Sequence, residues 1–181
     1  RPWNPPDRYY RLLAEVKVPE PPTLFDDYAG RTSSARSQKM EIGRGMTLAS
    51  DLKVLPSGKA PDRLTPAQAE AWQAAFKARN AAFQQAKLEG RDLTRWKYQE
   101  YMKDYLRCVK AVDDSVGRLV DYLKQEGLET NTVVIYAADQ SFFNGEHGWF
   151  DKRWMFEESL AMPLIVRWRG GSRRGTRIHA I

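Results

Sequence analysis

The sequence predicts an α/β fold of the doubly wound type, with helices packed on a mixed sheet. Two observations carry this prediction. Nine of the ten prolines precede Ala67 and none lies in residues 67–127, where apolar residues recur at helical spacing. Two short apolar runs rich in β-branched residues then follow, at residues 132–138 and 164–168. A helical stripe followed by such strands is expected in part of a doubly wound sheet.

The first part of the chain, residues 1–64, is proline-rich and predicted to form loops. Pro6 is placed to begin a short helix over residues 7–13, because its missing N–H needs no partner there. The sequence VPEPP then favours an extended path. Residues 31–58 have mixed charge and little periodicity, so no regular element is predicted for them.

The middle part is predicted to form two helices. Thr65 and Pro66 begin the first in the preferred order, and Gly90 is a suitable stop. Asp92 is predicted to cap the second, which ends at Gly127. Its apolar stripe comprises Tyr98, Tyr101, Met102, Tyr105, Cys108, Val109, Val112, Val116, Leu119, Val120 and Leu123. We expect this stripe to be buried against the sheet that contains residues 132–138.

The run at residues 132–138 is predicted to be a strand buried on both faces. Asp139 and Gln140 follow it directly, and ligands in open α/β sheets gather beyond the carboxyl ends of the strands. A carboxylate and an amide oxygen are hard ligands that suit calcium or magnesium. Calcium takes roughly six to eight oxygens, so the remaining ligands must come from substrate, water or other residues.

Two further polar side chains lie in the loop after Gln140. His147 and Lys152 are donors that can hold an anionic group beside a cation and assist the departure of a leaving oxygen. Together with the oxygen ligands they suit hydrolysis of a sulfate or phosphate ester. The alternative interpretation is structural: Asp139 caps the following turn, His147 is a loop histidine hydrogen-bonded to backbone, and Lys152 is a solvated surface charge.

The segment DQSFFNGEHGWFDKRWMFEESLAMPLIV, residues 139–166, resembles the C-terminal metal and substrate segment of the type I sulfatases, in the alkaline phosphatase superfamily. The resemblance also covers the helix at residues 95–128. It implies that Asp139 and Gln140 bind a calcium ion, that Glu146 and His147 belong to a GEHG turn, and that Lys152 contacts the sulfate. The family has a glycine where Ser141 stands, so a positive φ there would strain the serine.

The same resemblance gives expectations for the rest of the chain. Residues 1–181 are expected to be an internal to C-terminal part of one sulfatase catalytic domain, with substrate-side loops in 1–64, helices in 65–127 and the metal and sulfate segment in 128–181. Trp3 and Asn4 follow a proline-rich family pattern and are candidates for binding substrate, although packing of Trp3 is the alternative. Further candidates for contacting a sugar or aryl group are Asp26, Asp27, Arg31 and Arg36.

Sulfatases of this family use a formylglycine nucleophile made from a cysteine or serine in the context Cys/Ser-x-Pro-x-Arg. Cys108, the one cysteine, is followed by Val109, Lys110 and Ala111 and lies on the apolar stripe, so it is not that residue. The nucleophile is therefore expected outside this chain, and the 181 residues alone are expected to be inactive. The family resemblance implies a periplasmic, secreted or lysosomal protein.

The net charge of +6 suits a polyanionic partner such as sulfated polysaccharide. Much of it is local, at Arg167, Arg169, Arg173, Arg174 and Arg177. The leading hypothesis is part of a calcium-dependent sulfatase acting on an aryl or saccharide sulfate, with no nucleic acid partner and no membrane span. Two alternatives stay open: a phosphate or phosphonate ester hydrolase of the same superfamily, and a non-catalytic basic module that binds polyanions.

Overall fold

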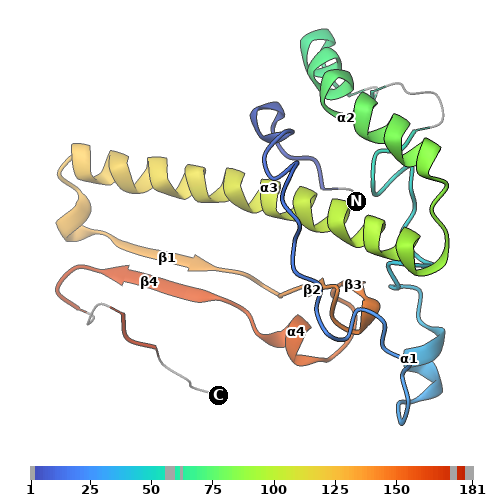
Figure 1. Ribbon diagram of the computed structural model, residues 1–181. Coiled ribbons are helices and arrows are strands. Elements are labelled where there is room, and N and C mark those ends of the chain that lie inside the picture. The colour runs from blue at the N-terminus through green and yellow to red at the C-terminus, as the bar shows by residue number, and fades with distance from the viewer. Residues whose placement is uncertain (1–2, 56–59, 62, 172–174, 178–181) are drawn as a thin grey trace. The chain divides into compact units, whose positions relative to one another are not determined.

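The structure is a computed structural model that describes residues 3–55, 60, 61, 63–171 and 175–177 (Figure 1). The chain divides into two compact units. The first comprises residues 1–111 and 143–151, and the second comprises residues 112–142 and 152–181. Arg173 and Arg174 of the predicted basic cluster lie outside the described residues.

The first long helix, α2, spans Pro66–Ala86 and begins where the sequence predicts. Thr65 and Gln68 form a reciprocal capping box, which satisfies two backbone donors at the start of the helix. The predicted stop at Gly90 was wrong, because Lys87 already adopts a left-handed conformation with φ 45°. Gly90 is the first residue of the next helix instead.

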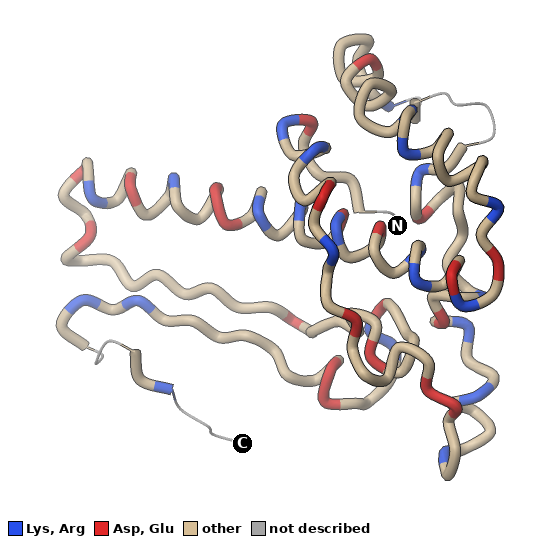
Figure 2. The backbone as a smooth tube through the Cα atoms, viewed as in Figure 1, with Lys and Arg blue, Asp and Glu red and all other residues tan. Residues whose placement is uncertain are grey.

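Helix α3 spans Gly90–Gln125, and Asp92 lies in its first turn rather than at its N-cap. Lys and Arg are interspersed with Asp and Glu along α3 (Figure 2). The N-terminal half of the predicted stripe is buried, with Tyr98 only 2 % exposed. The C-terminal half is half-buried or exposed, and Val112 and Leu119 are among its exposed residues. The predicted burial therefore holds only for the N-terminal half, and its partner is a core from residues 18–52 rather than the predicted strand at residues 132–138.

The residues packed against α3 come largely from the segment for which no regular element was predicted. Ile42, Met46 and Leu52 are almost fully buried and share one cluster with the aromatic residues of α3. This segment includes α1, Ser33–Ser37, with Thr32 as its N-cap. Residues 31–58 therefore supply much of the core of the first unit, although they lack periodicity.

Near the N-terminus, the predicted helix over residues 7–13 was wrong. The structure has a single 3-10 turn, η1, at Asp7–Tyr9, followed by turns. Leu13 has φ 61°, a left-handed conformation that cannot continue a right-handed helix.

The two predicted strands are present as β1, Val133–Ala137, and β4, Leu164–Trp168, and they pair antiparallel from Val133 opposite Trp168 to Ala137 opposite Leu164. Burial on both faces was wrong, because Ile135 is 62 % exposed. Between them lie β2, Phe143–Asn144, and β3, Phe150–Asp151, which form a second antiparallel pair. The described strands therefore form two separate antiparallel pairs, and no parallel pair occurs among them (Figure 1).

The connections contain three short helices: η2, Glu129–Asn131; η3, Glu146–Gly148; and α4, Glu157–Leu160. Among the described helices, none combines the length and the hydropathy that crossing a bilayer requires.

Candidate active site

The side chains of Asp139 and Lys152 meet beyond the end of β1. Asp139 Oδ1 and Lys152 Nζ are 3.9 Å apart. The carboxylate is 89 % exposed and the lysine side chain 33 % exposed, so the pair is open to solvent. The ammonium group also lies 5.6 Å from the centroid of the Phe142 ring. The loop thus brings together the two residues that the sequence assigned to metal and to anion.

Backbone contacts with α4 and its flanks hold this loop in the second unit. The backbone N–H of Ala138 donates to the carbonyl of Pro163 at 3.3 Å, and that of Ser141 donates to the carbonyl of Ser159 at 3.1 Å. The hydroxyl of Ser159 donates to the carbonyl of Lys152 at 3.1 Å. Ser141 is not among the described residues with positive φ, so replacing the family's glycine there introduces no such strain.

In the first unit, the GEHG turn is built from left-handed backbone. Gly145 has φ 104°, His147 56° and Gly148 69°. A Cβ at Gly145 would lie 2.5 Å from the ring of Tyr98, and one at Gly148 would lie 2.8 Å from the carbonyl oxygen of Leu24. Both glycines are therefore required by conformation and by close packing.

The imidazole of His147 is buried and bound to a carboxylate from the N-terminal part of the chain. Its Nδ1 is 2.7 Å from Asp26 Oδ2, and the guanidinium of Arg31 is 3.1 Å from the same oxygen. Burial raises the pKa of Asp26, but the hydrogen bonds from His147 and the backbone of Tyr28, together with Arg31, lower it below its ordinary value overall. The imidazole, the carboxylate and the guanidinium form one partly buried polar cluster, which we call the His147 cluster.

The backbone of His147 is also fixed. Its N–H donates to the hydroxyl of Thr23 at 3.0 Å, and its carbonyl accepts from the Tyr28 hydroxyl at 2.7 Å. The indole N–H of Trp149 donates to the same hydroxyl at 2.7 Å. Burial and the neighbouring Glu41 raise the pKa of Tyr28 to about 12, so it stays a neutral donor. His147 is therefore fixed in place by side chains from residues 23–31, and its imidazole binds a carboxylate instead of the backbone that the structural alternative expected.

Trp3 packs into the first unit instead of standing free. Its ring meets that of Tyr105 edge-on, with centroids 5.3 Å apart and an interplanar angle of 72°. Its carbonyl accepts a hydrogen bond from the ammonium group of Lys53. Asn4 is exposed. The structure thus unites Asp139 with Lys152 in one unit and His147 with Asp26 and Arg31 in the other.

A model of the sulfatase family matches residues 20–181. The chain belongs to the sulfatase family. Over its whole length it is 41 % identical to an N-acetylglucosamine-6-O-sulfatase of Bacteroides thetaiotaomicron, and it covers 34 % of that protein. It therefore spans about a third of the length of this relative, and it is a partial sulfatase catalytic domain.

The structural comparison agrees with the sequence comparison. A solved protein in complex with its substrate, D-glucosamine-2-N,6-O-disulfate, superimposes with a TM-score of 0.87 and 42 % identity, over 93 % of this sulfatase chain and 36 % of that one. A more distant relative is a multifunctional alkaline phosphatase superfamily protein of Trinickia caryophylli, 26 % identical over 55 % of this chain and 20 % of its own length.

The single cysteine of this sulfatase chain is not an activated nucleophile. Cys108 is half-buried on α3, and burial together with the nearby Asp104 raises the pKa of its thiol to about 11. A thiol with such a pKa is almost entirely protonated at neutral pH.

The side-chain oxygens that follow β1 suit part of a metal site. The described residues contain no group of three or more His, Cys, Asp or Glu side chains arranged to hold a metal ion. Asp139 and Gln140 are adjacent, exposed and oxygen-bearing, which fits two ligands of a hard cation whose other ligands lie elsewhere.

Proposed function

We propose that the complete enzyme hydrolyses sulfate monoesters of saccharides, and specifically the 6-O-sulfate of a glucosamine-type sugar. The observation that carries this proposal is the 41 % identity, over the whole chain, to an N-acetylglucosamine-6-O-sulfatase. The similar solved structure, whose substrate is D-glucosamine-2-N,6-O-disulfate, supports the same substrate class.

Lys152 is proposed to stabilise negative charge near the leaving oxygen, and its placement 3.9 Å from Asp139 supports this role. Asp139 and Gln140 are proposed to hold a calcium ion, which when bound would neutralise charge on the sulfate oxygens. A formylglycine outside this chain is proposed as the nucleophile. The same family resemblance supports action in the periplasm, in a lysosome or outside the cell.

His147 is proposed as a positioning residue for the GEHG turn, because its Nδ1 already binds Asp26. Its exchange for Asn keeps a side-chain donor and tolerates left-handed backbone, whereas Ala does neither. If the residue acts by positioning, His147→Asn retains much of the kcat that His147→Ala loses. A residue that transfers protons directly would lose activity equally in both variants.

The test is sulfate release from D-glucosamine-2-N,6-O-disulfate by the complete enzyme. Lys152→Ala and Asp139→Ala are expected to lower kcat/KM by about 100-fold or more, the usual loss for a group that binds developing charge. Lys124→Ala and Asp121→Ala are the controls, because these side chains form an exposed ion pair in the same unit, with their charged atoms 3.1 Å apart. Wild-type activity in Asp139→Ala would contradict the assignment.

A second candidate keeps the superfamily and changes the substrate to a phosphate or phosphonate ester. The similarity to the multifunctional alkaline phosphatase superfamily protein supports it. Because a cation and a lysine suit either anion, rates on matched sulfate and phosphate esters distinguish the two candidates. The proposed sulfatase prefers the sulfate ester.

A further inference from the structure

A pocket of about 650 Å³ lies in the first unit, lined by residues 17–20 and by Arg95, Trp96 and Gln99 of α3. Every lining residue belongs to that unit, so the second unit contributes no wall. The volume is within the range of roughly 300–1,000 Å³ that is typical of small-molecule sites. None of the functional roles described above uses this pocket.

Polar contacts hold the two walls of the pocket together. The side-chain amide of Gln99 accepts from the N–H of Val18 at 2.9 Å and donates to the carbonyl of the same residue at 2.8 Å. The Nε of Arg95 donates to the carboxylate of Glu20 at 3.2 Å. The segment at residues 17–20 is thus tied to α3 at two positions, and the pocket is preformed.

The pocket contains one aromatic ring and one cation that is open to a ligand. Trp96 is half-buried, and the ring of Phe83 packs on it with centroids 4.0 Å apart, which holds the indole in place. Within the part of the chain that the structure describes, the indole N–H makes no hydrogen bond and the exposed ammonium group of Lys17 has no partner. Two cations and one carboxylate line the pocket, and since Arg95 is paired with Glu20, Lys17 carries its net charge of +1.

We propose that this pocket binds a sulfated sugar unit of a glycan chain and so holds the enzyme on a polymeric substrate. This proposal rests on the proposed function, which makes a sulfated saccharide the substrate. Trp96 packs on the apolar face of the sugar ring, and Lys17 binds its sulfate. The carboxylate of Glu20 accepts a hydrogen bond from a sugar hydroxyl. A nucleic acid strand suits the pocket less well, because that carboxylate repels phosphate groups.

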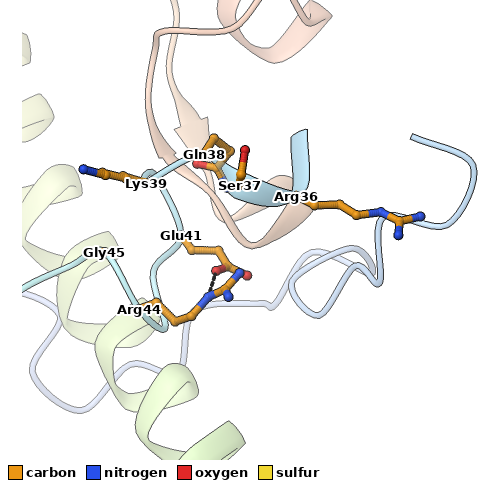
Figure 3. A pocket seen from close by; sticks show the side chains of 7 residues that line it. All are labelled: Arg36, Ser37, Gln38, Lys39, Glu41, Arg44 and Gly45. Carbon is orange, nitrogen blue, oxygen red and sulfur yellow. Dashed lines mark hydrogen bonds and ion pairs between the residues drawn. The ribbon is translucent and has the colours of Figure 1, made fainter. Parts of the chain in front are cut away.

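Another pocket of the first unit provides a matched control. It has a volume of about 360 Å³ and is lined by residues 36–39, 41, 44 and 45, none of which is aromatic (Figure 3). Lys39 of that pocket is exposed, as Lys17 is. The two lysines therefore differ chiefly in whether an indole ring lines the same pocket.

The test is calorimetric titration of the complete enzyme with a heparin-type oligosaccharide that lacks 6-O-sulfate, so that the proposed reaction cannot consume it. Lys17→Ala should raise Kd about 3-fold at low salt, in the range of one exposed ion pair, and the effect should shrink as salt rises. Trp96→Ala should raise Kd about 5-fold, because it removes the stacking surface. Both variants should keep the wild-type kcat/KM on D-glucosamine-2-N,6-O-disulfate.

The control Lys39→Ala should bind the oligosaccharide as the wild type does. Lys17→Arg and Trp96→Tyr keep the charge and the ring, and each should restore most of the affinity. Lys17→Ala changes an exposed side chain only, so it keeps the proposal testable if Trp96→Ala does not fold. Wild-type affinity in Lys17→Ala, an equal loss in Lys39→Ala, or equally tight binding of an unsulfated oligosaccharide that carries only carboxylates would overturn the proposal.

The proposed function and the glycan site fail in different ways. If the wild-type enzyme releases no sulfate from the monosaccharide disulfate, the proposed function is wrong. Binding of the oligosaccharide without 6-O-sulfate does not depend on that reaction, so the titration still decides whether the pocket holds a sulfated glycan. Tighter binding of single-stranded DNA than of the oligosaccharide, lost in Trp96→Ala, would assign the pocket to nucleic acid and would refute the glycan site.

Discussion

At the scale of the residue, the GEHG turn depends on glycines that no other residue can replace without strain. Gly148 combines φ 69° with a backbone oxygen 2.8 Å from where its Cβ would be. Gly117, in contrast, lies within α3 without a positive φ, and a Cβ added there would meet nothing within 4 Å. The two glycines therefore predict opposite outcomes for the same substitution.

We expect Gly148→Ala to lower the free energy of unfolding by about 1–3 kcal/mol, because the alanine must adopt a strained conformation and displace a carbonyl. Gly117→Ala should raise it by about 0.5–1 kcal/mol, since glycine is costly within a helix. Urea titration of the complete enzyme measures both. An unchanged stability for Gly148→Ala would show that the turn relaxes freely.

The His147 cluster predicts a specific dependence on pH. The pKa of Asp26 is lowered in the folded state from its ordinary value of 3.8, so its contribution to stability is present above about pH 4 and is lost as pH falls through the folded pKa. Asp26→Asn should therefore weaken the loss of stability below pH 4. The exposed Asp27→Asn is the control and should keep the wild-type acid profile, measured by thermal unfolding across this range.

His147 has a side-chain partner that its local sequence does not predict. The GEHG motif is short and local, so the sequence predicts that His147 lies in a polar loop. Its partner Asp26 lies 121 residues earlier, and nothing in local spacing links the two. The sequence suggests only sugar contacts for Asp26 and Arg31, whereas the structure shows both bound in the His147 cluster.

At the scale of the element, α3 is anchored by buried charge as well as by apolar packing. Asp104 is 1 % exposed, and it accepts from Lys53 at 2.6 Å and from Arg107 at 2.9 Å. Arg107 also donates to the carbonyl of Leu12 at 2.7 Å. The carboxylate thus ties the helix to Lys53, and its partner Arg107 ties the helix to Leu12.

Removing that carboxylate should be among the most destabilising single changes in the first unit. Asp104→Ala leaves two buried cations without their partner, for which we expect a loss of about 3–5 kcal/mol. Asp121→Ala on the same helix breaks an exposed pair and should cost less than about 0.5 kcal/mol. Chemical denaturation of both variants checks the contrast, and similar losses would argue against a role for burial.

Elements with local signals were predicted well. Thr65 and Pro66 fixed the start of α2, and β-branched runs fixed β1 and β4 to within a residue at each end. The core contributed by Ile42, Met46 and Leu52 was not predicted, because buried residues in an irregular segment have no period to detect.

At the scale of the whole molecule, the chain covers about a third of its sulfatase relative, and this explains its uneven burial. Both strands of the β1–β4 pair carry large exposed apolar side chains, including Ile135, Leu164 and Trp168. The composition of β1 predicts a strand that is buried on both faces. The strand is exposed in this chain, because its composition suits its place in the complete domain.

We therefore expect the amides of β1 and β4 to exchange with deuterium much faster in the isolated 181 residues than in the complete enzyme. The amides of residues 97–107, which are packed within the first unit, should differ far less between the two samples. Mass spectrometry of peptic fragments gives both rates. Equal protection of β1 in the two samples would show that the strand pair is stable by itself.

The chain passes from one compact unit to the other at three points, and the last of them falls between Asp151 and Lys152. His147 and Lys152 are five positions apart in sequence, yet they belong to different compact units. Under the role proposed for Lys152, substitutions around it are expected to change the binding of an oxyanion while leaving the contacts of the His147 cluster in the first unit intact. Directed evolution of altered ester preference would do best to vary residues 152–163 and leave residues 143–151 alone.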